Sequence, residues 1–135
     1  MDVTLSQIAM DRIVEHARAE HPRECCGILL GVGDRIGDVV PAANVHATPC
    51  THFEIDPQAL VDAHRAARIG GPEVLGYYHS HPEGAARPSQ TDQEMASGDG
   101  RIWLIAGRRD GALSVTLWRD APGGFIPLSH KVTSA

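Results

Sequence analysis

The pattern of apolar and polar positions along the chain predicts three helices. Apolar side chains recur every three to four residues between Gln7 and Glu20, which predicts an amphipathic helix with Ser6 as its N-cap. The pair Asp56-Pro57 places a capping residue before a proline at the first helical position, and predicts a second helix that runs to about Ala67. A third, short helix is predicted over residues 89–97, because a serine opens this segment as a cap.

Between the helices, short apolar runs bounded by glycine and proline predict strands. They cover residues 25–30, 35–40, 73–81, 101–106 and 113–119, with a brief strand at 53–55 and a last extended piece after Gly123-Gly124. Turn sequences at 31–34 and 110–111 predict hairpins, and residues 133–135 are expected to fray. Strands interleaved with helices predict an α/β fold, a single domain over residues 1–135 built on a mixed β-sheet flanked by helices.

Length, composition and charge are those of one folded domain. The chain has 135 residues, of which 42% are hydrophobic and 21% charged, so it can form an apolar core without disulfides. A formal net charge of −5 disfavours nucleic acid as a partner. No apolar stretch reaches the ~20 residues that span a bilayer, and residues 1–10 lack the pattern of a signal peptide. With three cysteines and no export signal, the protein is expected to be cytoplasmic, with reduced thiols and no membrane partner.

Two histidines and an aspartate form the candidate site. His79 and His81 lie two residues apart at the end of a predicted strand, so their side chains point to the same face. The seven residues between His81 and Ser89 are long enough to fold back and bring Asp92, in the first turn of the next helix, beside the histidines. Two histidines and one carboxylate leave a fourth tetrahedral position open for water, as in catalytic zinc sites.

Each of these residues also has a plainer interpretation. Ser89 and Asp92 fit a capping box at a helix start, which is compatible with metal binding because the cap fixes the helix that carries the ligand. A pair of histidines two residues apart is, by itself, more often surface or core histidine than a pair of ligands. Two histidines and a carboxylate also hold Fe(II) in oxygenases, but that site usually lies in an all-β fold, and this chain has too much predicted helix.

Together these residues resemble the signature of a known family. The sequence His79-Ser80-His81, followed by seven residues and then Ser-x-x-Asp, matches the JAMM (MPN-plus, Mov34/PAD-1) metalloproteases. That family also has an upstream glutamate in a segment similar to residues 22–31, which contains Glu24. The resemblance covers about residues 5–120. It implies the MPN/JAMM fold, a cytidine-deaminase-like mixed sheet flanked by helices.

The resemblance implies a role for five residues. His79, His81 and Asp92 match the ligands of a catalytic Zn2+ ion. Glu24 matches the general base that deprotonates the zinc-bound water, and Ser89 matches the residue whose hydroxyl stabilises the oxyanion. Without the resemblance, Glu24 would be interpreted as a solvated carboxylate at a strand start, because several other glutamates are also candidates.

The resemblance also implies a substrate. It indicates a zinc metallopeptidase or isopeptidase, a deubiquitinase-like hydrolase, that cleaves after the C-terminal Gly-Gly of a ubiquitin-like or sulfur-carrier protein. Eukaryotic members carry inserted segments that grip ubiquitin, whereas only residues 93–100 separate Asp92 from the next predicted strand. The chain is therefore similar to compact prokaryotic members that process sulfur carriers, including those that release cysteine. Two alternatives remain: a non-catalytic MPN scaffold, although such domains typically lose ligands that are all present here, and a general small metallopeptidase.

The cysteines, the tryptophans and the remaining histidines are expected to play no catalytic role. Cys25 and Cys26 lie in an apolar strand and are expected to be buried. Trp103 and Trp118 lie on opposite arms of the last predicted hairpin and are expected to pack in the core or across strands. Six further histidines are scattered and expected to be solvated: His16, His21, His46, His52, His64 and His130.

Overall fold

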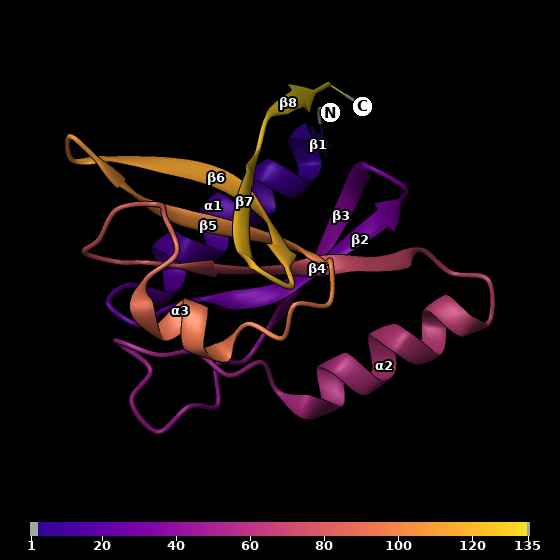
Figure 1. The fold of residues 1–135 in the computed structure, drawn as a ribbon, viewed down its shortest axis with the longest axis horizontal. Coiled ribbons are helices and arrows are strands. Elements are labelled where there is room, and N and C mark those ends of the chain that lie inside the picture. Colours follow the sequence, from indigo (N-terminus) through magenta and orange to yellow (C-terminus); the bar gives the residue numbers. More distant parts are fainter. Residues whose placement is uncertain (1–2, 135) are drawn as a thin grey trace.

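The computed structural model describes residues 3–134 and consists of an eight-stranded sheet with helices on both faces (Figure 1). The helices are α1 (Gln7–Glu20), α2 (Pro57–Arg68) and α3 (Gln90–Met95). The strands are β1 (Val3–Ser6), β2 (Cys26–Val32), β3 (Arg35–Ala42), β4 (Glu73–Ser80), β5 (Ile102–Arg109), β6 (Ala112–Ala121), β7 (Gly124–Leu128) and β8 (His130–Thr133). The predicted mixed α/β fold is confirmed.

Strand β4 lies at the centre of the sheet, whose order is β7-β6-β5-β4-β2-β3-β1-β8. It pairs antiparallel with β2 and parallel with β5, and the chain crosses from β4 to β5 through α3. Binding sites in open α/β sheets form outside the carboxyl ends of such central strands. The carboxyl end of β4 is where the sequence places both histidines of the candidate site.

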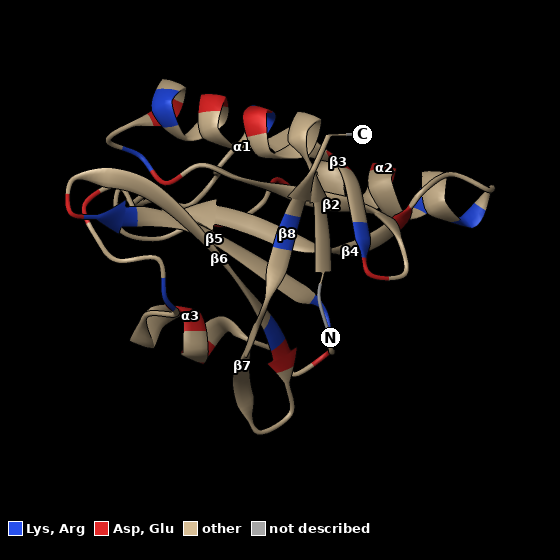
Figure 2. Cartoon of the chain, turned by 90° about the horizontal axis from the view of Figure 1, so that it is seen from above, with Lys and Arg blue, Asp and Glu red and all other residues tan. Residues whose placement is uncertain are grey.

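Two apolar clusters hold the helices against the sheet. Helix α1 covers one face, and α2 and α3 cover the other; Figure 2 shows α1 and α3 on opposite sides of the sheet. The cluster on the α1 side includes Leu5, Ile13, Leu29, Tyr78 and Leu104. The cluster on the other side includes Cys26, Ile28, Phe53, Ala63 and Trp103. Because neighbours along a strand face opposite sides, Tyr78 and His79 belong to different layers, and the candidate site lies on the side of α2 and α3.

The structure differs from the sequence predictions in three places. Strand β1 was not predicted, and it pairs in parallel with β8 at the edge of the sheet. Thr133 does not fray: it lies in β8 opposite Ser6, while Ala135 is outside the described residues. Residues 53–55 do not form a ladder, because only Ile55 makes a single bridge, to Asn44. Very short strands carry too little periodicity to be recognised from the sequence.

Within residues 3–134, no helix has the length and apolar character that crossing a bilayer requires.

Candidate active site

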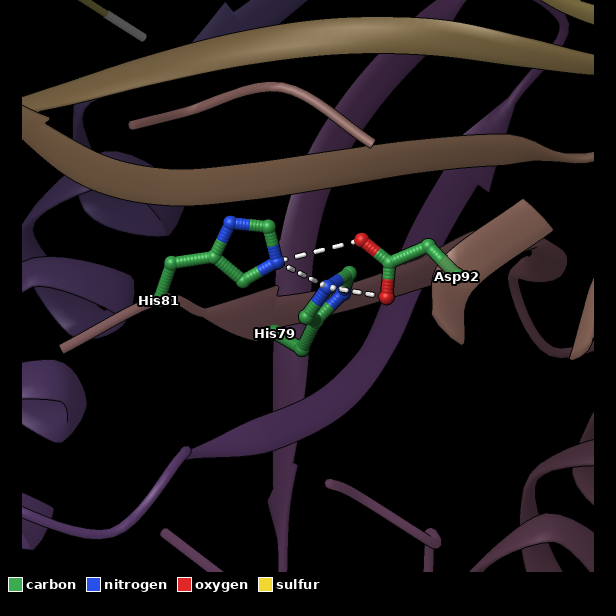
Figure 3. A group of neighbouring side chains, drawn as sticks. All are labelled: His79, His81 and Asp92. Carbon is green, nitrogen blue, oxygen red and sulfur yellow. Dashed lines mark hydrogen bonds and ion pairs between the residues drawn. The ribbon is translucent and has the colours of Figure 1, made fainter. Parts of the chain in front are cut away.

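The end of β4 brings the two histidines together. Cys26 of β2 lies opposite His79, and the backbone N–H of His81 donates to Ala106 of β5 at 2.7 Å, so the chain stays extended past the last residue of the strand. The Nε2 atoms of His79 and His81 are 3.1 Å apart (Figure 3). The prediction that both imidazoles share one face is confirmed.

The loop after His81 folds back over the end of β5 and the middle of β6. The N–H of Arg108 donates to the carbonyl of Gly84 at 2.8 Å, and the hydroxyl of Thr116 donates to the carbonyl of Ala86. Gly107 makes the close approach possible, because a Cβ there would clash with the backbone of residues 85–86. The loop is thereby held in the path that returns the chain to the histidines and starts α3 beside them.

Helix α3 points Asp92 at both histidines. Its Oδ1 lies 3.1 Å from Nε2 of His79, and its Oδ2 lies 3.1 Å from Nε2 of His81, as Figure 3 shows. Only 3% of Asp92 is exposed. Burial alone would raise the pKa of Asp92, but hydrogen bonds from both histidines and from the Ser89 N–H hold it well below the ordinary value. The carboxylate is therefore ionised at neutral pH.

Ser89 and Asp92 form the predicted capping box. The Ser89 hydroxyl oxygen accepts from the Asp92 N–H at 3.0 Å, and the Asp92 Oδ2 accepts from the Ser89 N–H at 2.9 Å. This second bond fixes the carboxylate that faces the histidines, in the way that outer partners orient metal ligands. Since the Ser89 hydroxyl acts only as an acceptor in the cap, its hydrogen can still be donated to another group.

His79 is held in an aromatic box. The side chain is fully buried, and Phe53 stacks on it with ring centroids 4.2 Å apart and an interplanar angle of 16°. Trp103 meets it edge-on at 5.7 Å. Burial lowers the pKa of His79, which keeps the imidazole neutral, as a metal ligand must be. Within residues 3–134 its Nδ1 has no hydrogen-bond partner, so the polar contacts of the ring are made at Nε2.

His81 can offer a lone pair at the same point. Its Nδ1 lies 2.8 Å from the carbonyl oxygen of Ala85, which can only accept, so Nδ1 carries a proton. When Nε2 gives up the proton that it shares with Asp92, the neutral ring has a lone pair there with which to bind a metal. Although burial opposes it, Asp92 and the Ala85 carbonyl raise the pKa of His81. One donor atom from each of His79, His81 and Asp92 lies within 4.8 Å of the others. This set of two imidazoles and a carboxylate can hold a metal ion.

Glu24 lies next to this group. It lies two residues before the start of β2. The residue between them, Cys25, is bonded to β4: its N–H donates to the Ser80 hydroxyl at 2.8 Å, and its carbonyl accepts from the Ser80 N–H at 3.1 Å. Only 7% of Glu24 is exposed. Burial raises the pKa of Glu24 to about 7, with the charge of His81 opposing the rise and that of Asp92 adding to it. Glu24 is thus a buried carboxylate, not the solvated one its sequence position alone suggests.

The cysteines, tryptophans and histidines outside the site differ in how far they are buried. Cys25 and Cys26 are buried, and Trp103 lies opposite Trp118 in the β5–β6 ladder, as expected. Of the six histidines expected to be solvated, His21 is exposed, whereas the others are half-buried: His16, His46, His52, His64 and His130. The Nδ1 of His16 lies 2.7 Å from the hydroxyl of Tyr78. Phe53 was missed, since nothing in the sequence links a residue 26 positions upstream to the ring of His79.

The fold and this donor group are those of a metal-dependent hydrolase. The model of the family described as prokaryotic homologs of the JAB domain matches residues 6–120, so the chain belongs to this family, the compact prokaryotic form of the JAMM/MPN-plus metallopeptidases.

Individual relatives agree with this assignment. The chain is 37% identical over 122 residues to the desampylase of Haloferax volcanii, a match that covers 86% of this chain and 87% of that protein. It is 31% identical over 103 residues to the CysO-cysteine peptidase of Mycobacterium tuberculosis, covering 75% and 70% respectively. The solution structure of protein DSY2949 from Desulfitobacterium hafniense superimposes with a TM-score of 0.86 at 29% identity, covering 98% of this chain and 94% of that one.

Proposed function

We propose that the chain is a zinc-dependent peptidase that hydrolyses the amide bond after the C-terminal Gly-Gly of a ubiquitin-like or sulfur-carrier protein. The observation that carries the proposal is the convergence of His79, His81 and Asp92 at the end of β4, with the buried Glu24 beside them. The names of the relatives, desampylase and CysO-cysteine peptidase, support a substrate of this class.

The metal-binding residues in this proposal are His79, His81 and Asp92. Two imidazole nitrogens and one carboxylate oxygen suit zinc and leave a coordination position for a reactant. Zinc, when bound, supplies a Lewis acid that activates water and polarises the scissile carbonyl. The aromatic box around His79 and the capping box at Asp92 hold the donor atoms in place before the metal arrives.

Glu24 acts as the general base. Its carboxylate takes a proton from the attacking water and then gives that proton to the leaving amine. A carboxyl group whose pKa is raised to about 7 has both protonation states accessible near neutral pH, as this exchange requires. A cation held beside it favours the ionised form that accepts the first proton. No covalent bond between enzyme and substrate is needed.

Ser89 stabilises the negative charge that develops on the carbonyl oxygen. Its hydroxyl hydrogen is not used by the cap and can be donated to that oxygen. Ser89→Ala should therefore lower kcat by about 10²–10³-fold and reduce the free energy of unfolding by about 1 kcal/mol through loss of the cap. Steady-state kinetics and urea unfolding measure the two effects. Ser89→Thr keeps a hydroxyl and should retain both, whereas a Ser89→Ala variant with wild-type kcat would contradict the assignment.

The expected substrate is an extended tail that ends in Gly-Gly. Glycine has no side chain, so its backbone can approach a recessed metal closely. In the present structure Asp92 and the start of β5 are separated by a short connection, so few contacts with the globular body of the carrier are expected, and affinity should be micromolar or weaker.

This substrate assignment can be tested with two fusions of one carrier, ending in Gly-Gly-X and Ala-Ala-X. The release of X is measured by mass spectrometry. It should be at least about tenfold faster from the Gly-Gly-X fusion, because Ala-Ala adds two Cβ atoms where the substrate backbone must approach the metal-binding group. Equal cleavage of both would indicate a general metallopeptidase. Stoichiometric zinc without any cleavage would indicate a non-catalytic scaffold.

A further inference from the structure

The segment between β3 and α2 folds around the side chain of Asn44. The Asn44 Nδ2 donates to the carbonyl of Glu24 at 3.0 Å and to that of His52 at 2.9 Å. The Asn44 Oδ1 accepts from the N–H of His46 at 3.1 Å and from that of Glu54 at 3.0 Å. One amide group thus bonds four main-chain atoms, from residues 24, 46, 52 and 54, and its Nδ2 also makes a longer contact of 3.4 Å to the carbonyl oxygen of Pro49.

The main chain of Glu24 depends on this segment. Glu24 lies outside the ladder of β2, which begins at Cys26, so strand pairing does not fix it. Its N–H donates to the carbonyl of Pro49 at 2.7 Å, and its own carbonyl accepts from Asn44. Both polar main-chain atoms of Glu24 are therefore held by this segment, through Asn44 and Pro49.

The same segment also reaches the metal-binding residues. Glu54 donates its N–H to Asn44, and the residue before it, Phe53, stacks on His79. Asn44 therefore fixes one end of a segment that contacts two parts of the site. It bonds the main chain of Glu24, and its Phe53 stacks on His79. No alanine, and no side chain with only a donor or only an acceptor, can make all four bonds.

We infer that Asn44 is a positioning residue, which sets the place of the Glu24 carboxylate over the metal-binding group by holding the Glu24 carbonyl and the turn of residues 45–54. This inference rests on the proposed role of Glu24 as general base. Asn44 itself touches no reacting group. Its loss should displace the carboxylate and leave the donor atoms of His79, His81 and Asp92 in place.

The first test compares kinetics of the zinc-loaded enzyme on a carrier fusion. Asn44→Ala should lower kcat by about 10–10²-fold, the cost of a displacement on the order of 1 Å, while KM and zinc content stay within about twofold of wild type. Asn44→Asp keeps the two acceptor bonds and the shape, but turns an oxygen toward the Glu24 carbonyl, and should lose kcat similarly. Thr48→Val is the control: it removes hydroxyl contacts to His46 and His52 in the same turn and should keep wild-type kcat.

The second test asks whether Asn44 acts through Glu24. In a double-mutant cycle, Asn44→Ala should have almost no further effect on kcat once Glu24→Gln is present, because there is no base left to position. If Asn44→Ala lowers kcat by the same factor in the Glu24→Gln enzyme as in the wild type, Asn44 acts elsewhere, and the inference is overturned. Wild-type kcat in both Asn44 variants would overturn it as well.

The third test needs no activity. Hydrogen exchange of the peptide covering residues 20–28 should be faster in Asn44→Ala than in wild type or Thr48→Val, since the Glu24 N–H donates to Pro49 of this segment. Unchanged exchange would disprove the positioning even if the carrier fusion were not a substrate. A Glu24→Gln enzyme with full activity would instead disprove the base assignment while the exchange result still stands.

Discussion

Replacing His79 or Asp92 with alanine is expected to remove the zinc and to lower cleavage of a carrier fusion by a factor on the order of 10³. Each variant leaves two donors where catalytic zinc sites have three. The Lewis acid supplies several kcal/mol of stabilisation to the developing charge, and each 1.4 kcal/mol corresponds to a tenfold change in rate. Elemental analysis of the purified proteins, together with single-turnover cleavage, measures both losses.

The two variants differ in what else they disturb. His79→Ala leaves a cavity beside Phe53 and Trp103, and Asp92→Ala removes the acceptor of the Ser89 N–H. Circular dichroism should still show a folded protein, because the apolar clusters on both faces of the sheet remain. Glu94→Ala, an exposed acid on the same helix, is the control and should keep both zinc and activity. Full zinc occupancy in Asp92→Ala would refute the ligand assignment.

The convergence of His79, His81 and Asp92 could be predicted because its geometry is local. Alternation along β4 places His79 and His81 on one face, and a capping serine places Asp92 in the first turn of α3. Each relation needs only a strand, a loop and a helix start that the sequence marks clearly. The convergence of the three side chains then follows from the length of the loop between them.

The surroundings of the group could not be predicted because they depend on distant contacts. Phe53 contacts His79, and Asn44 contacts Glu24 across 20 positions of the chain. Apart from the brief strand predicted at residues 53–55, their segment shows neither helical nor strand periodicity. Strands β1 and β8 meet from opposite ends of the sequence. Glu24 itself stood out only through the family resemblance, since its burial comes from packing that no local pattern encodes.

Glu24→Gln is expected to keep zinc and to lower kcat by about 10²–10⁴-fold, the usual contribution of a general acid–base group. Glutamine has nearly the same shape and leaves the backbone bonds to Pro49 and Asn44 in place, so what is lost is the proton acceptor. Glu20→Gln is the matched control: this glutamate lies four residues earlier and pairs with Arg23 at 3.4 Å, and its change should leave kcat near wild type. A Glu24→Gln enzyme that cleaves at the wild-type rate would assign the base to another carboxylate.

The same substitution should also change how stability depends on pH in the metal-free protein. Burial raises the pKa of Glu24 from an ordinary value of 4.5 to about 7, so between these values the native state holds a proton that the unfolded chain has released. The stability of the wild type should therefore fall relative to Glu24→Gln as the pH rises through this range, and the difference should level off above pH 7. Urea unfolding of both chelator-treated proteins at pH 5 and pH 8 measures it. If the unfolding free energies of the two proteins change in parallel with pH, the Glu24 carboxylate is solvated. Its pKa is then not raised by burial toward the neutral range in which the proton exchange takes place.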